Sequence, residues 1–322
     1  MPSTQPSSQP SIQPASKPFT FIIGCPRSGT TLLRAMLDSH SEIAVPPESY
    51  FILPALRHTP VNGEFGSIDR RVILDAVLAQ KSFVKWRLND GDLLPIVEDD
   101  SIKSASATVA GVYAVFAEVH GKKTAIDKTP HHTEHVGRLS NAYPGSRFIH
   151  LVRDGRDVIP SLQAMPWFPL RYRDAALYWR DRALSGRGAL GIVGSSRFHE
   201  LRYEDLLSDP ERELTRLCRF LGLDFEPEML TYHERADDVI AGMGTLGSHQ
   251  NIRRAPAPTR DWQTDYDKRT LALFEAFAGD ALAVFGYEPG PEPSWRRRAQ
   301  AAALNAWVPV KKRINILSKR QI

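Results

Sequence analysis

Short apolar runs alternate along this chain with longer stretches in which apolar residues recur at helical spacing. Five runs have the length and composition of buried strands, at residues 19–23, 42–45, 123–127, 147–152 and 198–203. Helices are predicted directly after the first run and at about 171–189, 209–221 and 267–285. This alternation predicts an α/β fold, in which helices cover both faces of a parallel sheet.

The stretch at 50–120 departs from this alternation, because its pattern is mainly helical. We interpret it as a cap on the substrate side of the sheet, inserted into the sheet topology. Its aromatic residues are the expected apolar lining of a substrate site, namely Tyr50, Phe51, Phe83 and Trp86.

The two ends of the chain differ in composition from its body. Residues 1–18 are rich in Ser, Gln and Pro and are expected to be disordered. After Glu292 there is no acidic residue but there are eight basic ones, and removing these eight from the formal charge of +4 leaves −4. We therefore divide the chain into a disordered segment at 1–18, a folded domain at 19–290 and a basic tail at 291–322.

Apolar side chains interleave with the charges of this tail, and two interpretations are open. One is a helix that touches an anionic membrane or an acidic partner. The other is a solvated end that packs Trp295 or Trp307 on the body of the protein. No recognised nucleic-acid-binding module accompanies the charge, so nucleic acid is not an expected partner.

Cysteine content and hydropathy bear on the location of the protein. Only Cys25 and Cys218 occur, which gives no disulfide framework and suits a reducing compartment. The first residues lack the charged start and apolar core of a signal peptide, and no apolar run is long enough to span a bilayer. A cytoplasmic protein is expected.

The most specific local pattern lies between the first predicted strand and the helix after it, in Gly24-Cys25-Pro26-Arg27-Ser28-Gly29-Thr30-Thr31. Its glycine spacing is that of a phosphate-binding loop, but Thr30 stands where a Walker A loop has lysine. Backbone amides from Ser28 to Thr31 would face an anion at the helix N-terminus, and Arg27 adds a cation suited to an oxyanion. An ATP or GTP site normally needs the lysine. The loop therefore suits a nucleotide with one 5′-phosphate group, and the alternative is a plain turn.

This loop resembles the 5′-phosphosulfate loop of sulfotransferases that use PAPS, 3′-phosphoadenosine 5′-phosphosulfate. The shared pattern is P-R-S-G-T-T-L-L-R-x-M-L-D-x-H, most similar to the branch with tyrosylprotein sulfotransferases and many bacterial enzymes. The resemblance implies the sulfotransferase fold, built on a P-loop-type sheet, with PAPS as co-substrate. It also implies a 5′ site formed by Pro26, Arg27, Ser28, Gly29, Thr30 and Thr31. Fixed cations would act in place of Mg²⁺, so no metal site is expected.

A second pattern, at residues 148–161, resembles the 3′-phosphate site of the same family. A predicted strand ends there at Arg153, and Ser161 follows eight residues later on the next helix. We expect Asp157 to cap this helix and Pro160 to lie in its first turn. The alternative is a buried Arg–Asp pair that pins the strand end, with Ser161 as an ordinary surface residue.

Two further segments resemble nucleotide contacts of the family. Tyr203 begins a Tyr-Glu-Asp segment at the end of the last predicted strand, and the resemblance implies that it contacts the nucleotide. The basic stretch at 249–254 falls where the family has a mobile loop over the nucleotide, but it departs from the Arg-Lys-Gly form of cytosolic sulfotransferases. Arg254 is the expected contact, and Arg253 and Arg260 are open alternatives.

Sulfuryl transfer needs a base for the proton of the acceptor and cations around the leaving phosphate. Lys128 matches the family lysine that stabilises the transferring sulfuryl group, and it would act with Arg27. Glu48 matches the catalytic Glu of the tyrosylprotein branch, whereas cytosolic sulfotransferases use a His after the third strand, here His131 or His132. Glu48 is the favoured base and His131 the alternative. A helix-capping role for Glu48 is also open, and the two His residues lack the further ligands of a metal site.

Together these patterns predict an enzyme that transfers the sulfuryl group of PAPS to an acceptor hydroxyl or amine by in-line displacement. The acceptor is open between a small molecule, a glycan, a lipid and a peptide. Two rival functions are a P-loop kinase of small molecules, which needs Mg²⁺ and ATP, and a nucleotide-binding regulator that lacks catalysis.

Overall fold

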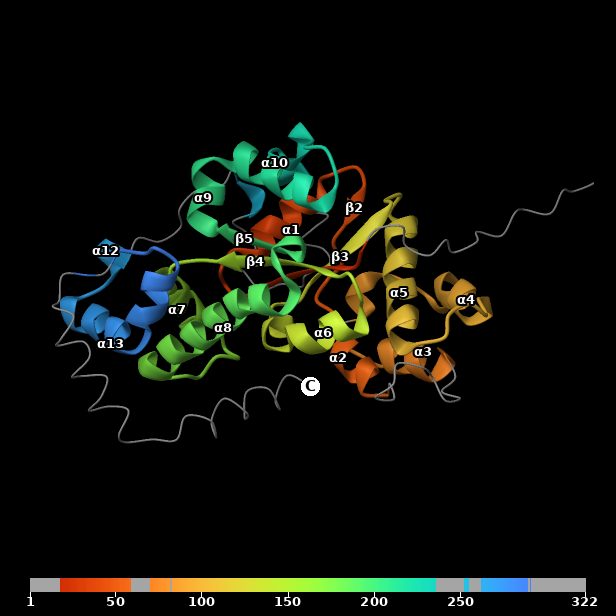
Figure 1. The fold of residues 1–322 in the computed structure, drawn as a ribbon, viewed down its shortest axis with the longest axis horizontal. Helices are drawn as coiled ribbons and strands as arrows, with labels where there is room; N and C mark the ends of the chain where they lie inside the picture. Colours follow the sequence, from red (N-terminus) through yellow and green to blue (C-terminus); the bar gives the residue numbers. More distant parts are fainter. Residues whose placement is uncertain are drawn as a thin grey trace, which may run out of the picture.

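Five parallel strands form the central sheet, in the order β2-β3-β1-β4-β5 (Figure 1). The computed structural model describes residues 18–58, 70–81, 83–235, 252–254, 262–288 and 290. The strands are β1 (Thr20–Gly24), β2 (Ile43–Ala44), β3 (Thr124–Lys128), β4 (Arg147–Val152) and β5 (Phe198–Arg202). Each predicted strand is therefore confirmed, with both ends within one residue.

Helices cover both faces of this sheet, because successive side chains of a strand point to opposite sides. Ile22 and Ile149 face one layer, which consists of α1 (Thr30–Asp38), α9 (Tyr203–Ser208) and α10 (Pro210–Leu221). Phe21 and Phe148 face the other, which includes α5 (Ala105–Val119), α6 (Val136–Ala142) and the end of α8 (Tyr172–Val193). Figure 1 shows α9 and α10 above the sheet and α6 below it. The predicted α/β fold is confirmed.

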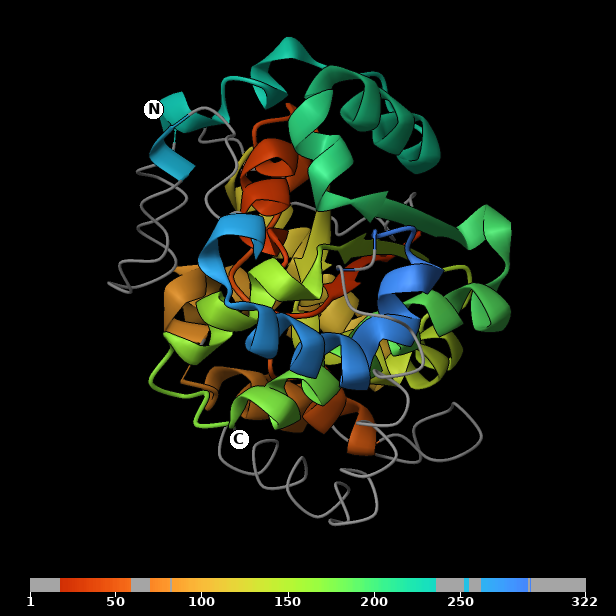
Figure 2. The same ribbon diagram turned by 90° about the vertical axis from the view of Figure 1, so that its left-hand side faces the viewer.

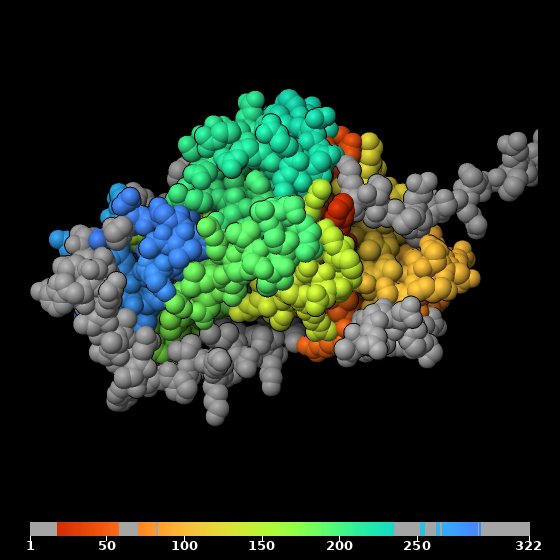
Figure 3. Space-filling view, in the orientation of Figure 1, coloured from red at the N-terminus to blue at the C-terminus, as the bar shows by residue number. Residues whose placement is uncertain are grey.

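A third cluster of side chains lies beyond the carboxyl end of β4. It joins α8 to α7 (Gly155–Gln163) and α13 (Lys268–Val284) around Val152 and Trp179. Figures 1 and 2 both place α13 against this part of the protein, and Figure 3 shows α8 at the surface beside it. The short helix α12 (Trp262–Asp265) precedes α13. No helix among the described residues is both long enough and apolar enough to cross a bilayer.

The described part of the stretch at 50–120 is mainly helical, as predicted. It contains α2 (Ile52–Ala55), η1 (Leu56–His58), α3 (Arg70–Leu78), η2 (Phe83–Trp86), α4 (Asp90–Glu98) and α5. Its aromatic residues contradict the expected substrate lining, because Phe51, Phe83 and Trp86 are 1%, 3% and 0% exposed. Their rings pack on one another, with centroids 5.2–6.0 Å apart. These rings form a core that holds the short helices together. Of the four residues of the expected lining, only Tyr50 is half-buried.

The helix after β4 begins differently from the prediction. Asp154, not Asp157, is its N-cap, and the Asp154 carboxylate accepts a hydrogen bond from the Arg156 amide. Asp157 lies in the first turn and accepts instead from the Trp262 amide. Pro160 lies beyond the first turn, where its missing N–H leaves one helical hydrogen bond unmade. The cap was predicted at the wrong residue because Asp154 comes before Asp157, and its carboxylate accepts from a free amide of the first turn.

The remaining short helices are η3 (Pro130–His135), η4 (Ser195–Arg197), η5 (Pro227–Met229) and η6 (Tyr232–Arg235). The proposed disordered segment, apart from Pro18, lies outside the described residues, and so does the basic tail at 291–322. The proposed limits of the folded domain therefore stay a prediction.

Candidate active site

The loop between β1 and α1 has the geometry of an anion-binding turn. Gly29 precedes the helix with a φ of 96°, no side chain caps the helix, and no acidic residue lies in its first turn. The first amides of α1 and the positive end of its dipole are therefore available to an anion. Arg27 has a φ of 73°, which is unusual for a residue with a side chain. Strained backbone of this kind often occurs at functional sites.

Close packing explains both glycines of the loop. A Cβ on Gly24 would lie 2.3 Å from the carbonyl oxygen of Leu151, and a Cβ on Gly29 would lie 2.3 Å from Cδ2 of Tyr203. The Tyr203 ring therefore lies directly on the loop. The hydroxyl of Ser28 is buried and has no hydrogen-bond partner among the residues that the structure describes. A buried donor without a partner costs free energy, so this hydroxyl fits a site that a polar ligand completes.

The second predicted anion site lies next to this loop. Arg153 directly follows β4, is 6% exposed and stacks on the Tyr203 ring at 4.4 Å. Within the described part of the chain, its Nε is buried without a hydrogen-bond partner, and the carboxylate of Asp157 lies 3.8 Å from its Nη2. Ser161 is half-buried on α7, and its hydroxyl accepts a hydrogen bond of 2.9 Å from Nε of Arg27. The buried Arg–Asp pair of the alternative interpretation is present, as Arg153 with Asp157, but Ser161 is not an ordinary surface serine, because it is half-buried and hydrogen-bonded to Arg27.

The pKa of Asp157 is consistent with an anion nearby. Burial raises its pKa to about 6, although Arg153 works in the opposite direction. Its carboxylate is still mostly charged at pH 7, but on acidification it becomes neutral, and stops opposing a bound anion, at a higher pH than an ordinary aspartate.

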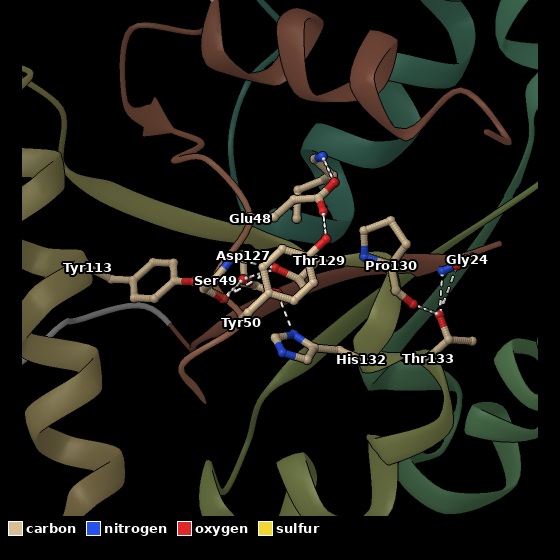
Figure 4. Close-up of polar contacts among 11 residues, drawn as sticks. Gly24, Glu48, Ser49, Tyr50, Tyr113, Asp127, Thr129, Pro130, His132 and Thr133 are labelled. Atoms are coloured by element: carbon tan, nitrogen blue, oxygen red, sulfur yellow. Dashed lines mark hydrogen bonds and ion pairs between the residues drawn. The ribbon is translucent and has the colours of Figure 1, made fainter. Parts of the chain in front are cut away.

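The candidate base and cation meet at the carboxyl ends of two neighbouring strands. Glu48 follows β2, and Lys128 is the last residue of β3, which pairs with β2. Lys128 donates from Nζ to Oε1 of Glu48 at 2.6 Å, and the Tyr50 hydroxyl donates to Oε2 at 2.5 Å. Figure 4 shows Glu48 and Tyr50 in this arrangement. The Lys128 side chain is 4% exposed, whereas that of Glu48 is 32% exposed and so reachable by an acceptor.

Glu48 is held in its charged form. Burial works to raise its pKa, but the charge and hydrogen bond of Lys128, with the hydrogen bond from Tyr50, outweigh burial and lower the pKa below its usual range. Burial and the Glu48 carboxylate raise the pKa of Tyr50, so its phenol stays a donor. Glu48 does not cap a helix, because α2 begins later, at Ile52, and no side chain caps it.

The two histidines that follow β3 have different surroundings. His132 is fully buried, and its Nδ1 lies 2.8 Å from Asp127, so it does not face an acceptor. His131 is half-buried, with its ring 6.5 Å from that of Tyr50. Burial and the neighbouring positive groups lower the pKa of His131 to about 4. It is therefore a weaker base than an ordinary histidine. The pKa of Glu48 is lowered as well, so basicity does not decide between them, and the choice of Glu48 stays a prediction.

Three residues of this site were not predicted to act on Glu48. The segment before Glu48 is held by α1, where Arg34 donates to the carbonyl of Val45 and Asp38 accepts from its amide, both at 2.7 Å. The Tyr50 hydroxyl donates to Glu48 itself. Arg34 and Asp38 belong to the first motif, but the motif does not indicate which groups they contact.

The structure does not group all the predicted residues. Pro26 is half-buried beside Arg27, and Thr30 and Thr31 begin α1. Arg254 has an exposed side chain, and its carbonyl accepts a hydrogen bond from Tyr232. Its predicted contact with the nucleotide stays a prediction, and Arg260 and residues 249–251 lie outside the described residues. Across the described part of the chain, no group of three or more His, Cys, Asp or Glu side chains is arranged to hold a metal ion.

The chain is similar in sequence to several known proteins. Nodulation protein NoeE of Sinorhizobium fredii is 24% identical over 292 residues, which cover 83% of this chain and 65% of that protein. Protein-tyrosine sulfotransferase 2 of Gallus gallus is 29% identical over 224 residues, which cover 67% of this chain and 54% of that protein. The chain thus spans 54–65% of the length of these curated relatives.

A solved structure shows the same fold. The sulfotransferase domain from the curacin biosynthetic pathway aligns with a TM-score of 0.60 at 23% identity, over 85% of this chain and 99% of that domain. A sequence model described as the sulfotransferase family matches residues 18–227, well over half of the 322 residues. The chain belongs to the sulfotransferase family.

Proposed function

We propose that this protein transfers the sulfuryl group of PAPS to a hydroxyl or amine of an acceptor by in-line displacement. One observation carries the proposal. Nε of Arg27, in the first loop, donates a hydrogen bond to the Ser161 hydroxyl of the second motif. The Tyr203 ring packs against both Gly29 and the guanidinium group of Arg153. Two anion-binding segments are therefore adjacent, as a nucleotide with separate 5′ and 3′ anions requires.

The residues of both segments have distinct roles in this proposal. The loop amides, with the hydroxyls of Ser28, Thr30 and Thr31, would hold the 5′ side of PAPS, and Arg153 and Ser161 would hold its 3′-phosphate. The Ser28 hydroxyl and Nε of Arg153 support this assignment, because both are buried and neither has a hydrogen-bond partner among the described residues. Tyr203 would contact the nucleotide between its 5′ and 3′ anions. Arg254 would contact the nucleotide at the edge of the site.

In the reaction, the acceptor oxygen or nitrogen forms a bond to sulfur as the bond between sulfur and the bridging oxygen of the 5′-phosphate breaks. Glu48 takes the acceptor proton, and the electron pair of the broken bond stays on the departing 3′-phosphoadenosine 5′-phosphate, PAP. Arg27 and Lys128 stabilise the negative charge on the sulfonate and the leaving phosphate. Positioning and fixed charges supply most of the rate enhancement in transfers of this kind.

Lys128 links the two halves of the mechanism. It is bonded to Glu48, and a sulfonate bound beside the loop would compete for the same ammonium group. As Lys128 moves its charge toward the sulfonate, the pKa of Glu48 rises toward its usual value, which makes the carboxylate a better proton acceptor.

Lys128→Met is expected to lower kcat by about 10²-fold, because a group that stabilises the transition state is lost. It should also move the acid limb of the kcat/KM profile to higher pH. Lys128 holds the pKa of Glu48 down, so without it the carboxylate takes up its proton at a higher pH as the medium is acidified. The variant retains the charge of Arg34 near Glu48 and the hydrogen bond from Tyr50. Both groups still stabilise the charged carboxylate, so the rise in its pKa should be limited.

Lys123→Met is the matched control for this variant. Lys123 also pairs with a glutamate, Glu42, at 2.8 Å, but its side chain is 72% exposed and away from Glu48. The control should keep the pH profile of the wild type. An acid limb unmoved in Lys128→Met, despite a loss of kcat, would show that the profile reports another base, with His131 as the first candidate.

Turnover of PAPS tests the proposed function. We expect release of PAP in the presence of a mixture of phenol, alcohol, amine and peptide acceptors, at the same rate with and without EDTA. A small-molecule kinase would instead turn over ATP and lose this activity in EDTA. A regulator would bind PAP tightly and release none from PAPS with any acceptor.

One relative is named for protein tyrosine as its acceptor, and we propose that the acceptor of this chain is a small molecule, glycan, lipid or peptide. A cytoplasmic location and a contact of the basic tail with an anionic membrane or acidic partner stay predictions from the sequence.

A further inference from the structure

The short segment that carries Glu48 is fixed at both ends. At its start, Arg34 and Asp38 hold the carbonyl and amide of Val45. At its end, Ser49 is 0% exposed and enters a network of buried polar groups. The residues between these ends are two prolines and Glu48, and proline restricts the backbone. The position of the Glu48 carboxylate therefore depends on how well Ser49 is held.

The network at Ser49 centres on the carboxylate of Asp127. Figure 4 shows the groups that converge on it from three parts of the chain. Its Oδ2 accepts from the hydroxyls of Ser49, Tyr113 and Thr129 at 2.5, 2.6 and 2.9 Å. Its Oδ1 lies 2.8 Å from Nδ1 of His132. The carboxylate is fully buried, and only such a full set of partners offsets the cost of its burial.

One further bond turns this network into a link between the base and the cation. The amide of Ser49 donates to Oγ1 of Thr129 at 2.9 Å, so Ser49 is tied to β3 through both its backbone and its side chain. Ser49 is adjacent to Glu48, and Asp127 and Thr129 flank Lys128. Neighbouring side chains of a strand point to opposite sides, so this buried link leaves Lys128 directed toward Glu48.

We propose that Asp127 is a positioning residue, which acts through Ser49 and Thr129 to hold the Glu48 carboxylate in register with the Lys128 ammonium. The inference rests on the proposed function, in which these two groups act on the acceptor and the sulfonate. Burial works to raise the pKa of Asp127, but His132 and the hydroxyls outweigh it and lower the pKa, so Asp127 remains a charged acceptor.

A pair of variants at Thr129 separates positioning from folding. Thr129→Val keeps the shape of the side chain but removes the hydroxyl that binds Ser49 and Asp127. Thr129→Ser keeps the hydroxyl. We expect kcat per PAP-binding site to fall by roughly 10–100-fold in Thr129→Val, since misplacement of a reacting group by about 1 Å has effects of this size. Thr129→Ser should restore most of the activity, and the Kd of PAP should change little in either variant.

Ser49→Ala supplies a second test that is mild enough to fold. Its control is Ser39→Ala, which also removes a buried serine hydroxyl, one that donates to the Ala35 carbonyl at the end of α1. Ser49→Ala should lose kcat as Thr129→Val does, whereas Ser39→Ala should keep it. Counting sites by calorimetric titration with PAP removes any effect of a smaller folded fraction.

A measurement without turnover makes the inference independent of the proposed reaction. Carbon-13 NMR of the labelled Glu48 carboxyl group reports its pKa directly, and Glu48→Gln assigns the signal. A looser pairing with Lys128 should raise this pKa in Ser49→Ala and Thr129→Val, but not in Thr129→Ser or Ser39→Ala. An unchanged Glu48 titration together with an unchanged kcat in Ser49→Ala and Thr129→Val would overturn the inference. If the wild type transfers no sulfuryl group, the proposed function fails, and the NMR shifts still decide the role of Asp127.

Discussion

Glu48→Gln is expected to lower kcat by about 10²–10⁴-fold, the range that a positioned general base contributes. Glutamine keeps the shape of the side chain. Its oxygen can still accept from Lys128, and its NH2 group can donate to the Tyr50 hydroxyl, so the site should stay assembled. Its amide cannot take the acceptor proton. The Kd of PAP should therefore remain close to that of the wild type, and the loss should appear in kcat measured at saturating PAPS.

Two controls make this result specific. Glu42→Gln changes a glutamate that pairs with the exposed Lys123, and it should keep full activity. His131→Asn removes the alternative base and should lower kcat far less than Glu48→Gln. Full activity in Glu48→Gln, with a large loss in His131→Asn, would transfer the role of the base to His131.

Removal of the Arg27 side chain is expected to have the second largest effect, a loss of roughly 10²–10³-fold in kcat. Arg27 belongs to the loop that faces the 5′ side and is bonded to Ser161 of the second segment. Its loss therefore removes charge from the transition state and also separates the two segments. We expect KM for PAPS to rise as well, since part of this contact exists before transfer begins.

The backbone at Arg27 provides a control for this variant. With its φ of 73°, the position favours glycine over alanine, so Arg27→Gly removes the side chain with less strain than Arg27→Ala. Both variants should lose activity to a similar degree, although Arg27→Ala should unfold at a lower temperature. Activity that follows stability, with Arg27→Gly close to the wild type, would contradict a role for the Arg27 cation.

Local patterns account for most of what the sequence predicted. The loop from Gly24 to Thr31 and the segment from Arg153 to Ser161 are each continuous in sequence, so spacing alone indicates their geometry. The five strands are short apolar runs with clear ends, and all five are confirmed. The helix after β4 was predicted with the wrong cap, because Asp154 and Asp157 are both near its start and only geometry distinguishes them.

Contacts between distant segments account for what the sequence did not reveal. Ser49 and Asp127 are 78 residues apart, and only the pairing of β2 with β3 brings them together. For the same reason Trp86 was mistaken for substrate lining, since apolar character does not distinguish a ring in a pocket from a ring in a core. The effect of Lys128 on the pKa of Glu48 was not predicted either. The two residues belong to motifs far apart in the sequence, and the spacing of motifs does not show that they are in contact.

If one nucleotide bridges the two anion sites, the wild type should bind PAP and 5′-AMP with different affinities. The two ligands differ only in the 3′-phosphate. In calorimetry with EDTA present, PAP should bind roughly 10–150-fold more tightly, as expected for about 1.5–3 kcal/mol from hydrogen bonds to a charged group. Arg153→Ala should remove most of this difference. Equal affinities for PAP and 5′-AMP, or tighter binding of ATP with Mg²⁺, would contradict the account.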